Sequence, residues 1–114
     1  ALIVPPTGRI REMSSSAPPL GATERLQVSA RSEQLFPGEM LVCYTDGIIE
    51  NERNVIEGEA RLRRVLSSLR MSERRAPAPA IRDRILGKHR GCDDVAILTI
   101  RHSPLQAVQD TSAA

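Results

Sequence analysis

Aromatic side chains are scarce in this chain of 114 residues, which has no Trp, one Tyr and one Phe. Proteins that hold single-stranded nucleic acid usually stack its bases on several aromatic rings, so this scarcity argues against that function. The net charge is only +2, and nucleic-acid binding would therefore need a clustered basic face. The arginines nearest to forming one are Arg61, Arg63, Arg64, Arg70, Arg74 and Arg75. We interpret those of the first helix as a solvated face rather than a phosphopeptide dock, and we expect no nucleic-acid partner.

Cysteine is equally scarce, because only Cys43 and Cys92 are present and most of the chain separates them. This content excludes a disulfide framework, and we interpret both as small apolar side chains rather than a redox switch or a soft-metal site. The chain also lacks an apolar run long enough to cross a bilayer. We therefore expect a soluble cytoplasmic protein, with no membrane contact in this segment.

The length and the hydrophobic content of 40% suit one globular domain. The first residue is Ala, and a strand pattern begins at once, with no charged leader before it. We therefore expect a domain truncated at its amino-terminal side, with its carboxy-terminal part at residues 1–101 and a disordered tail at residues 102–114.

Strand patterns dominate the first part of the chain. Apolar residues 2–4 and residues 9–13 flank a turn of Pro and Gly at residues 5–8, which predicts a hairpin. Apolar residues then alternate with polar ones from residue 26 to residue 30, which predicts a half-buried strand. Two later segments, 40–45 and 95–100, are apolar on both faces, so we expect both strands to lie centrally in a covered sheet.

Two helices are predicted between these last strands. In the first, one face carries Leu62, Val65, Leu66 and Leu69. The second spans residues 79–86, with Pro near its start and Gly87 just past its end. Strands combined with a helical pair indicate an α+β fold. Because two helices cover only one face of a sheet, the other face requires a second sheet, a partner or a further segment of the chain.

Two acidic motifs lie at the ends of the apolar strands. Thr45-Asp46-Gly47 follows the first strand, and Asp93-Asp94 precedes the second. A buried strand holds an aspartate at its end rigidly at the rim of the sheet, where it can face water and a cation. Taken alone, either motif is also compatible with an ordinary solvated turn, because Asp and Gly favour turns.

The order of several short motifs resembles the carboxy-terminal half of the metal-dependent PPM-type serine/threonine phosphatases, and in particular the bacterial stage II sporulation protein E-like branch. The resemblance extends to about Arg101. It depends on Leu20-Gly21, Leu35-Phe36-Pro37-Gly38-Glu39, the segment from Tyr44 to Glu50, the segment from Gly58 to Leu62, and the segment from Asp93 to Leu98. It implies part of an αββα four-layer sandwich.

The resemblance also implies a metal site. Asp46 and Asp93 match the family's metal ligands, and Gly47, Asp94 and Glu50 lie near them in the sequence. For Glu50, an ordinary solvated carboxylate is the favoured interpretation, and a role beside the ligands is the alternative. The family's chemistry uses two Mn²⁺ or Mg²⁺ ions and a bridging water that attacks the phosphorus of a phosphoserine or phosphothreonine, without a phosphoenzyme. Carboxylates suit such hard cations, and paired metals lower the pKa of a bound water.

Three departures from the family pattern stand out. The family's first acidic motif, an Asp in a Gly-rich turn that bridges both metals, has no counterpart here. Two carboxylates rarely hold a dinuclear centre, so we expect this segment alone to be inactive. In addition, Glu57 stands where the family usually has an aromatic residue, and Ala96 stands where Thr is the commonest residue in the family.

From the resemblance we expect a protein phosphatase in bacterial signalling, acting as part of a longer chain that can include an upstream sensor domain. Its substrate would be a phosphoprotein, and members of the branch often act on a phosphorylated anti-sigma factor antagonist. The alternative is a catalytically silent PPM-like domain that binds a regulatory partner.

Overall fold

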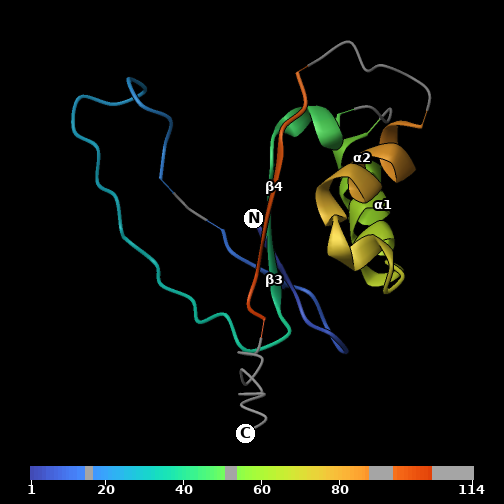
Figure 1. The fold of residues 1–114 in the computed structure, drawn as a ribbon. Coiled ribbons are helices and arrows are strands. Elements are labelled where there is room, and N and C mark those ends of the chain that lie inside the picture. Colours follow the sequence, from blue (N-terminus) through green and yellow to red (C-terminus); the bar gives the residue numbers. More distant parts are fainter. Residues whose placement is uncertain (15–16, 51–53, 88–93, 104–114) are drawn as a thin grey trace, which may run out of the picture.

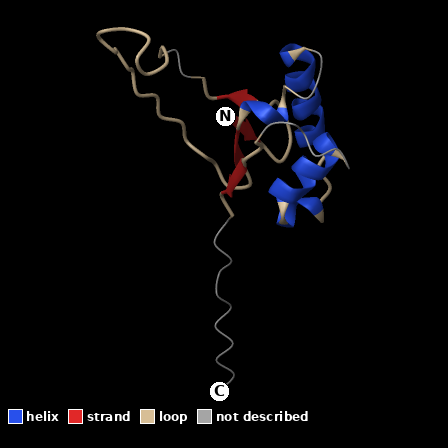
Figure 2. Cartoon of the chain, turned by 90° about the horizontal axis from the view of Figure 1, so that it is seen from above, coloured by secondary structure: helices blue, strands red, loops and turns tan. Residues whose placement is uncertain are grey.

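The computed structural model describes residues 1–14, 17–50, 54–87 and 94–103. They form an α+β structure in which a four-stranded antiparallel sheet carries a helical layer on one face (Figures 1 and 2). The strands are β1 (Leu2–Val4), β2 (Arg11–Glu12), β3 (Met40–Tyr44) and β4 (Ile97–Arg101). The helices are η1 (Asp46–Ile48), α1 (Val55–Ser67), η2 (Glu73–Arg75) and α2 (Pro77–Leu86). The predicted α+β class is confirmed, and the described residues supply one sheet and one helical layer.

The sheet has the order β2-β1-β3-β4. The predicted hairpin is confirmed, because β1 pairs with β2 and Leu2 lies opposite Glu12. Strand β3 is internal, between β1 and β4, and its register with β4 runs from Met40 opposite Arg101 to Tyr44 opposite Ile97. The ends of β3 and β4 that carry the two acidic motifs therefore lie side by side.

The core lies between the sheet and the helices. Alternate strand residues point into it, and both predicted helices bury their apolar faces against it. The buried residues of this cluster are Leu2, Val4, Met40, Val42, Ile48, Leu62, Val65, Leu66, Leu69, Ile81, Ile85 and Leu86. Leu69 belongs to the predicted face of α1 but follows the helix, which ends at Ser67.

Local sequence explains the helix ends. Asn54 caps α1 by accepting a hydrogen bond from the Ile56 amide at 2.9 Å. Helix α2 starts at Pro77, before the predicted position, since proline is well tolerated in a first turn. It ends at Gly87, whose φ of 58° is a conformation that favours glycine. No helix in the described part of the chain is long and apolar enough to span a membrane.

The sheet face turned away from the helices is open along β4, although Ile3 of β1, opposite Leu41 on the same face, is only 1% exposed. Leu41 lies opposite Ile100 and Cys43 opposite Leu98, so these side chains share that face. Leu98 and Ile100 are 58% and 50% exposed. The prediction that residues 95–100 form a central, covered strand is therefore wrong for the described chain, in which β4 is an edge strand. Its apolar pattern indicates coverage, but the described residues provide a covering layer on one face only.

The predicted strand at residues 26–30 is also wrong. This segment belongs to a long irregular excursion between β2 and β3 that runs away from the sheet (Figure 1). Val28 is 61% exposed, and Leu26 is exposed as well. Alternating side chains favour an extended backbone, but a strand also requires a neighbouring edge with which to pair. Residues 104–114, most of the predicted tail, lie outside the described residues.

An ion pair closes the base of this excursion. The Arg11 guanidinium donates to both carboxylate oxygens of Glu39, at 2.7 and 3.1 Å, and also to the Gln34 carbonyl. The same carboxylate accepts a hydrogen bond from the Phe36 amide at 2.9 Å. Glu39 is only 5% exposed. Its hydrogen bond with Arg11, followed by that from Phe36, lowers the pKa of the Glu39 carboxyl.

The replacement Glu39→Gln should destabilise the domain at pH 7 and flatten its acid unfolding profile. A lowered folded-state pKa contributes stability above the unfolded-state pKa, and this contribution is lost as the pH falls through the folded-state value. The unfolding temperature of the wild type and of the variant, measured from pH 7 downward, should therefore converge on the acidic side. Equal unfolding temperatures at pH 7 would contradict a stabilising role for this carboxylate.

Candidate metal centre

Asp46 lies where β3 ends and the short helix η1 begins. Its backbone carbonyl accepts hydrogen bonds from the amides of Ile49 and Glu50, both at 2.9 Å, while the Ile48 amide donates to the Thr45 carbonyl at 3.1 Å. Ile48 is 1% exposed and anchors the turn in the core. The backbone that presents Asp46 is thus fixed by a strand on one side and by a buried side chain on the other.

Thr45 joins the first acidic motif to the second. Its hydroxyl donates to the Asp94 carbonyl at 3.3 Å and accepts from the Ala96 amide at 2.9 Å. The Thr45 amide in turn donates to the Ala96 carbonyl at 3.1 Å. These bonds extend the β3–β4 pairing past Tyr44, up to the point where the second motif begins. The Asp94 backbone is therefore bonded to Thr45, the residue directly before Asp46.

Sequence reasoning did not assign this role to Thr45. The available signal was its place directly before Asp46, at the end of a strand, because a threonine hydroxyl there is able both to donate and to accept hydrogen bonds.

Helix α1 supports the same turn from the core side. At Gly58 the helix approaches η1 so closely that a Cβ atom would overlap the Ile49 carbonyl oxygen and lie 2.8 Å from the Ile49 carbonyl carbon. Gly58 is buried. Only glycine permits this contact, which places α1 directly beneath the end of the Asp46 turn.

The predicted site residues differ in how far the structure describes them. Asp46, Asp94 and Glu50 are exposed, and Gly47, within η1, is half-buried. No described residue forms a hydrogen bond or an ion pair with the carboxylates of Asp46, Asp94 or Glu50. The second predicted ligand, Asp93, lies outside the described residues. Among the residues that are described, no group of three or more His, Cys, Asp and Glu side chains is arranged to hold a metal ion.

This donor set fits a hard divalent cation. Mg²⁺ and Mn²⁺ prefer carboxylate oxygens, and magnesium is typically held by one or two carboxylates while it keeps several waters. A carboxylate that already pairs with an arginine or a lysine would have to give up that partner, whereas Asp46 has none in the described chain. The end of β3 that carries Asp46, with Asp94 beside Thr45, is thus chemically suited to bind such an ion together with ligands from elsewhere.

The arginines of α1 are not all free to bind a ligand. The Arg63 guanidinium donates to Glu59 at 2.9 Å and to Glu12 at 3.0 Å, so it links the helix to β2. Its hydrogen bond with Glu59 is the main reason that the pKa of Arg63 is raised. Nearby, burial raises the pKa of the Tyr44 hydroxyl, and the charges of Glu59 and Glu12 add to the effect. Arg63 thus has a structural role, because it holds α1 against β2.

The replacement Thr45→Val should weaken Mn²⁺ binding by the full-length protein about tenfold, the lower end of the loss usual for partners that orient metal ligands. It removes two hydrogen bonds but keeps the shape of the side chain, so it releases Asp94 without opening a cavity. The loss of stability should be about 1–2 kcal/mol, from two bonds of modest net value. Thr45→Ser retains the hydroxyl and should keep most of the affinity. Identical Mn²⁺ affinities of the Thr45→Val and Thr45→Ser variants would contradict the orienting role of the Thr45 hydroxyl.

Comparison with known proteins gives two matches. The family model described as stage II sporulation protein E (SpoIIE) matches residues 1–103. The protein named stage II sporulation protein E from Bacillus subtilis (strain 168) is 23% identical over 95 residues, which are 82% of this chain. The match covers 12% of that relative, so this chain corresponds to a small part of its length. No solved structure matches the chain.

Proposed function

Because the chain belongs to the stage II sporulation protein E family, a relationship that points to a phosphatase-type function, we propose that it forms the carboxy-terminal half of a PPM-type protein serine/threonine phosphatase domain. The observation that carries this proposal is the link made by Thr45, whose hydroxyl bonds to Asp94 and Ala96. It brings together the strand ends that carry both acidic motifs of the expected centre.

In this proposal Asp46 and Asp93 hold two Mn²⁺ or Mg²⁺ ions, together with a carboxylate from another part of the full-length protein. When bound, such ions activate water and stabilise charge on phosphoryl oxygens. The chain's own contribution is positional. Strand β3 and the buried Ile48 fix the Asp46 backbone, Thr45 fixes Asp94, and Glu50 follows on the exposed side of the turn.

The proposed substrate is a phosphoserine or phosphothreonine on a protein, for which a phosphorylated anti-sigma factor antagonist is the first candidate. Hydrolysis there would reverse a phosphorylation signal in the bacterial cytoplasm, and a sensor domain in the full-length protein would control it. The exposed rim suits a protein substrate, since a phosphorylated side chain on a folded partner must reach the ions from outside.

Hydrolysis by the full-length protein and by this segment alone tests the proposal. With Mn²⁺ present, the full-length protein should hydrolyse both p-nitrophenyl phosphate and phosphoserine peptides, and chelation should abolish the activity. The segment alone should remain at background, because its acidic motifs are too few for a dinuclear centre. A full-length protein that folds and binds a partner but hydrolyses neither substrate would instead support the silent interaction domain.

A further inference from the structure

A small pocket lies between α2 and the start of β4, outside the site described above. Its volume is about 200 Å³, and its lining residues are Ala78, Pro79, Arg82, Val95 and Ile97. Four of these are apolar, and Arg82 is the charged one. Val95 and Ile97 are half-buried, whereas Arg82 is exposed at the pocket's edge. The pocket thus combines an apolar floor with a single cation.

The pocket belongs to the same end of the molecule as the candidate metal centre. Val95 directly follows Asp94, and Ile97 lies opposite Tyr44, two positions before Asp46. Helix α2, which carries Arg82, also contacts η1, the short helix that begins at Asp46. A peptide that presents a phosphorylated residue to this rim can therefore reach the pocket with a neighbouring residue.

The volume indicates what the pocket can hold. Sites for small-molecule ligands and cofactors are usually about 300–1,000 Å³, which is larger than this pocket. About 200 Å³ instead suits one aliphatic side chain of a bound peptide.

Arg82 indicates the charge of the occupant. Within the described chain it has no hydrogen-bond or ion-pair partner. Arg84 on the same helix differs, because it donates to the Ser68 carbonyl and hydroxyl and lies 3.7 Å from Glu73. A guanidinium that no described residue binds, beside an apolar pocket, is complementary to a carboxylate next to an aliphatic side chain.

We propose that this pocket is a substrate-selecting subsite. It binds an aliphatic side chain of the phosphoprotein near the phosphorylated residue, while Arg82 pairs with an acidic residue beside that side chain. The inference rests on the proposed phosphatase function and adds to it a preference for substrates with an apolar and an acidic residue flanking the phosphorylation site.

The test uses the full-length protein and phosphoserine peptides in which a Leu-Asp pair is placed at each position from −4 to +4, with Leu-Lys and Ala-Ala peptides as comparisons. The wild type should prefer Leu-Asp at one position. Arg82→Glu should raise the KM for that peptide about tenfold with little change in kcat, since it removes binding rather than chemistry. It should also improve the KM for the Leu-Lys peptide, because the charge pair is restored with opposite signs.

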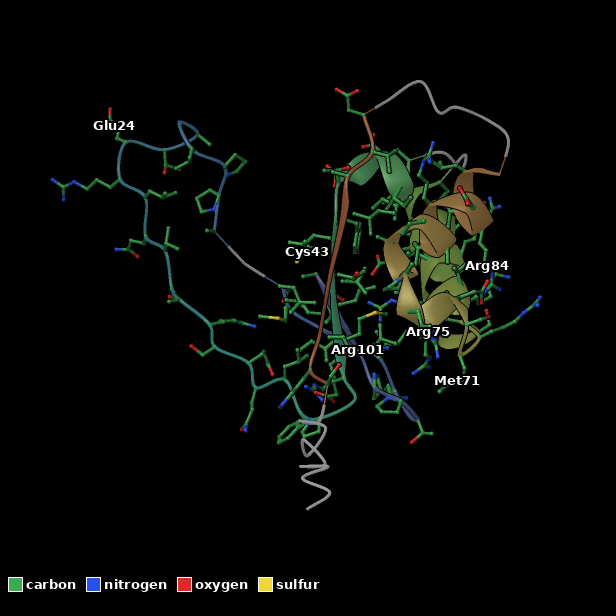
Figure 3. The ribbon with its side chains drawn as sticks, in the orientation of Figure 1. Glu24, Cys43, Met71, Arg75, Arg84 and Arg101 are labelled. Atoms are coloured by element: carbon green, nitrogen blue, oxygen red, sulfur yellow. The ribbon has the colours of Figure 1, made fainter. Side chains whose placement is uncertain are left out.

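Two further variants separate the pocket from general charge effects. Ala78→Leu fills the pocket without changing charge, and it should raise the KM for Leu-Asp and leave that for Ala-Ala unchanged. Arg75→Glu is the matched control, because Arg75 also has no partner among the described residues and lies at the other end of the helical layer from η1 (Figure 3). It should leave the peptide preference intact.

Assays with p-nitrophenyl phosphate distinguish a loss of peptide binding at the subsite from a loss of the hydrolysis step. This substrate has no flanking residues, so Arg82→Glu should leave its KM unchanged. If Arg82→Glu raised the KM for p-nitrophenyl phosphate as much as the KM for Leu-Asp, the proposal would be overturned and Arg82 would lie at the transferred phosphate. If Arg75→Glu and Arg82→Glu had equal effects on the peptides, the preference would come from net charge and the proposal would also be overturned. If the wild type hydrolyses neither substrate, the proposed phosphatase function is wrong. Peptide binding measured by fluorescence anisotropy then tests the pocket independently: a preference for Leu-Asp that Arg82→Glu removes would support the pocket, and equal binding of all peptides would overturn it.

Discussion

Replacing Asp46 with Asn in the full-length protein should abolish Mn²⁺-dependent hydrolysis and weaken Mn²⁺ binding by more than about 100-fold, beyond the loss typical for residues that only orient metal ligands. The change keeps the size of the side chain and removes its negative charge, which a hard cation requires. Asp46 is exposed and its carboxylate has no hydrogen-bond or ion-pair partner in the described chain, so the fold should not depend on its charge. Calorimetric Mn²⁺ titration, combined with an assay on p-nitrophenyl phosphate, measures both effects.

Glu50→Gln serves as the matched control for this change. Glu50 is an exposed carboxylate at the end of the same turn, and it also lacks a partner in the described chain. It should alter Mn²⁺ affinity less than about tenfold, below the range expected for an orienting residue. Asp93→Asn should behave like Asp46→Asn. Unchanged Mn²⁺ affinity in both aspartate variants, with unchanged unfolding temperatures, would refute the metal assignment.

Replacing Gly58 with Ala should have the largest effect on stability. Alanine normally favours a helix over glycine by about 1 kcal/mol, so a position without tertiary contacts would gain stability. Here the new Cβ would overlap the Ile49 carbonyl oxygen and lie 2.8 Å from its carbon, and backbone atoms do not yield as a flexible side chain does. We expect the overlap to dominate and to destabilise the domain by about 2–3 kcal/mol. Calorimetric unfolding of the full-length protein should show its transition lowered by about 5–10 °C.

The same change should also weaken the metal site, because Ile49 closes the turn that presents Asp46. Ala60→Gly, at an exposed position of α1, is the control for helix propensity. It should cost about 1 kcal/mol and leave Mn²⁺ affinity unchanged. If Gly58→Ala stabilised the protein, the close approach between α1 and η1 would not exist in solution.

Several elements were predictable because their signals are local. The turn at residues 5–8 and its flanking apolar residues predicted the β1–β2 hairpin, and Pro77 and Gly87 bracket α2 as proline and glycine commonly do. The segment at residues 26–30 shows the limit of this approach. Its alternation favours a strand, but pairing depends on whether another part of the chain offers a free edge, which no local pattern specifies.

The candidate site also contains residues that the sequence predicted and residues that it did not. The Thr45-Asp46-Gly47 and Asp93-Asp94 motifs were recognisable because a carboxylate at the end of an apolar strand is visible in the sequence itself. Thr45 and Gly58 were not assigned a role, because their partners, Asp94 and Ile49, are identified only once β3, β4 and α1 are placed in space. The pair of Arg11 with Glu39 was missed for the same reason, since the two residues lie 28 positions apart.

The sequence by itself determined the α+β class, the pair of helices and the end of α2 at Gly87, because hydrophobic period and capping residues are properties of neighbouring residues. The tertiary structure decided that β4 is an edge strand in the described chain, that Thr45 joins the acidic motifs, and that Arg82 borders a pocket beside them. These features depend on contacts between segments far apart in the chain. Such contacts depend on which surfaces pack together, and a one-dimensional pattern does not specify that choice.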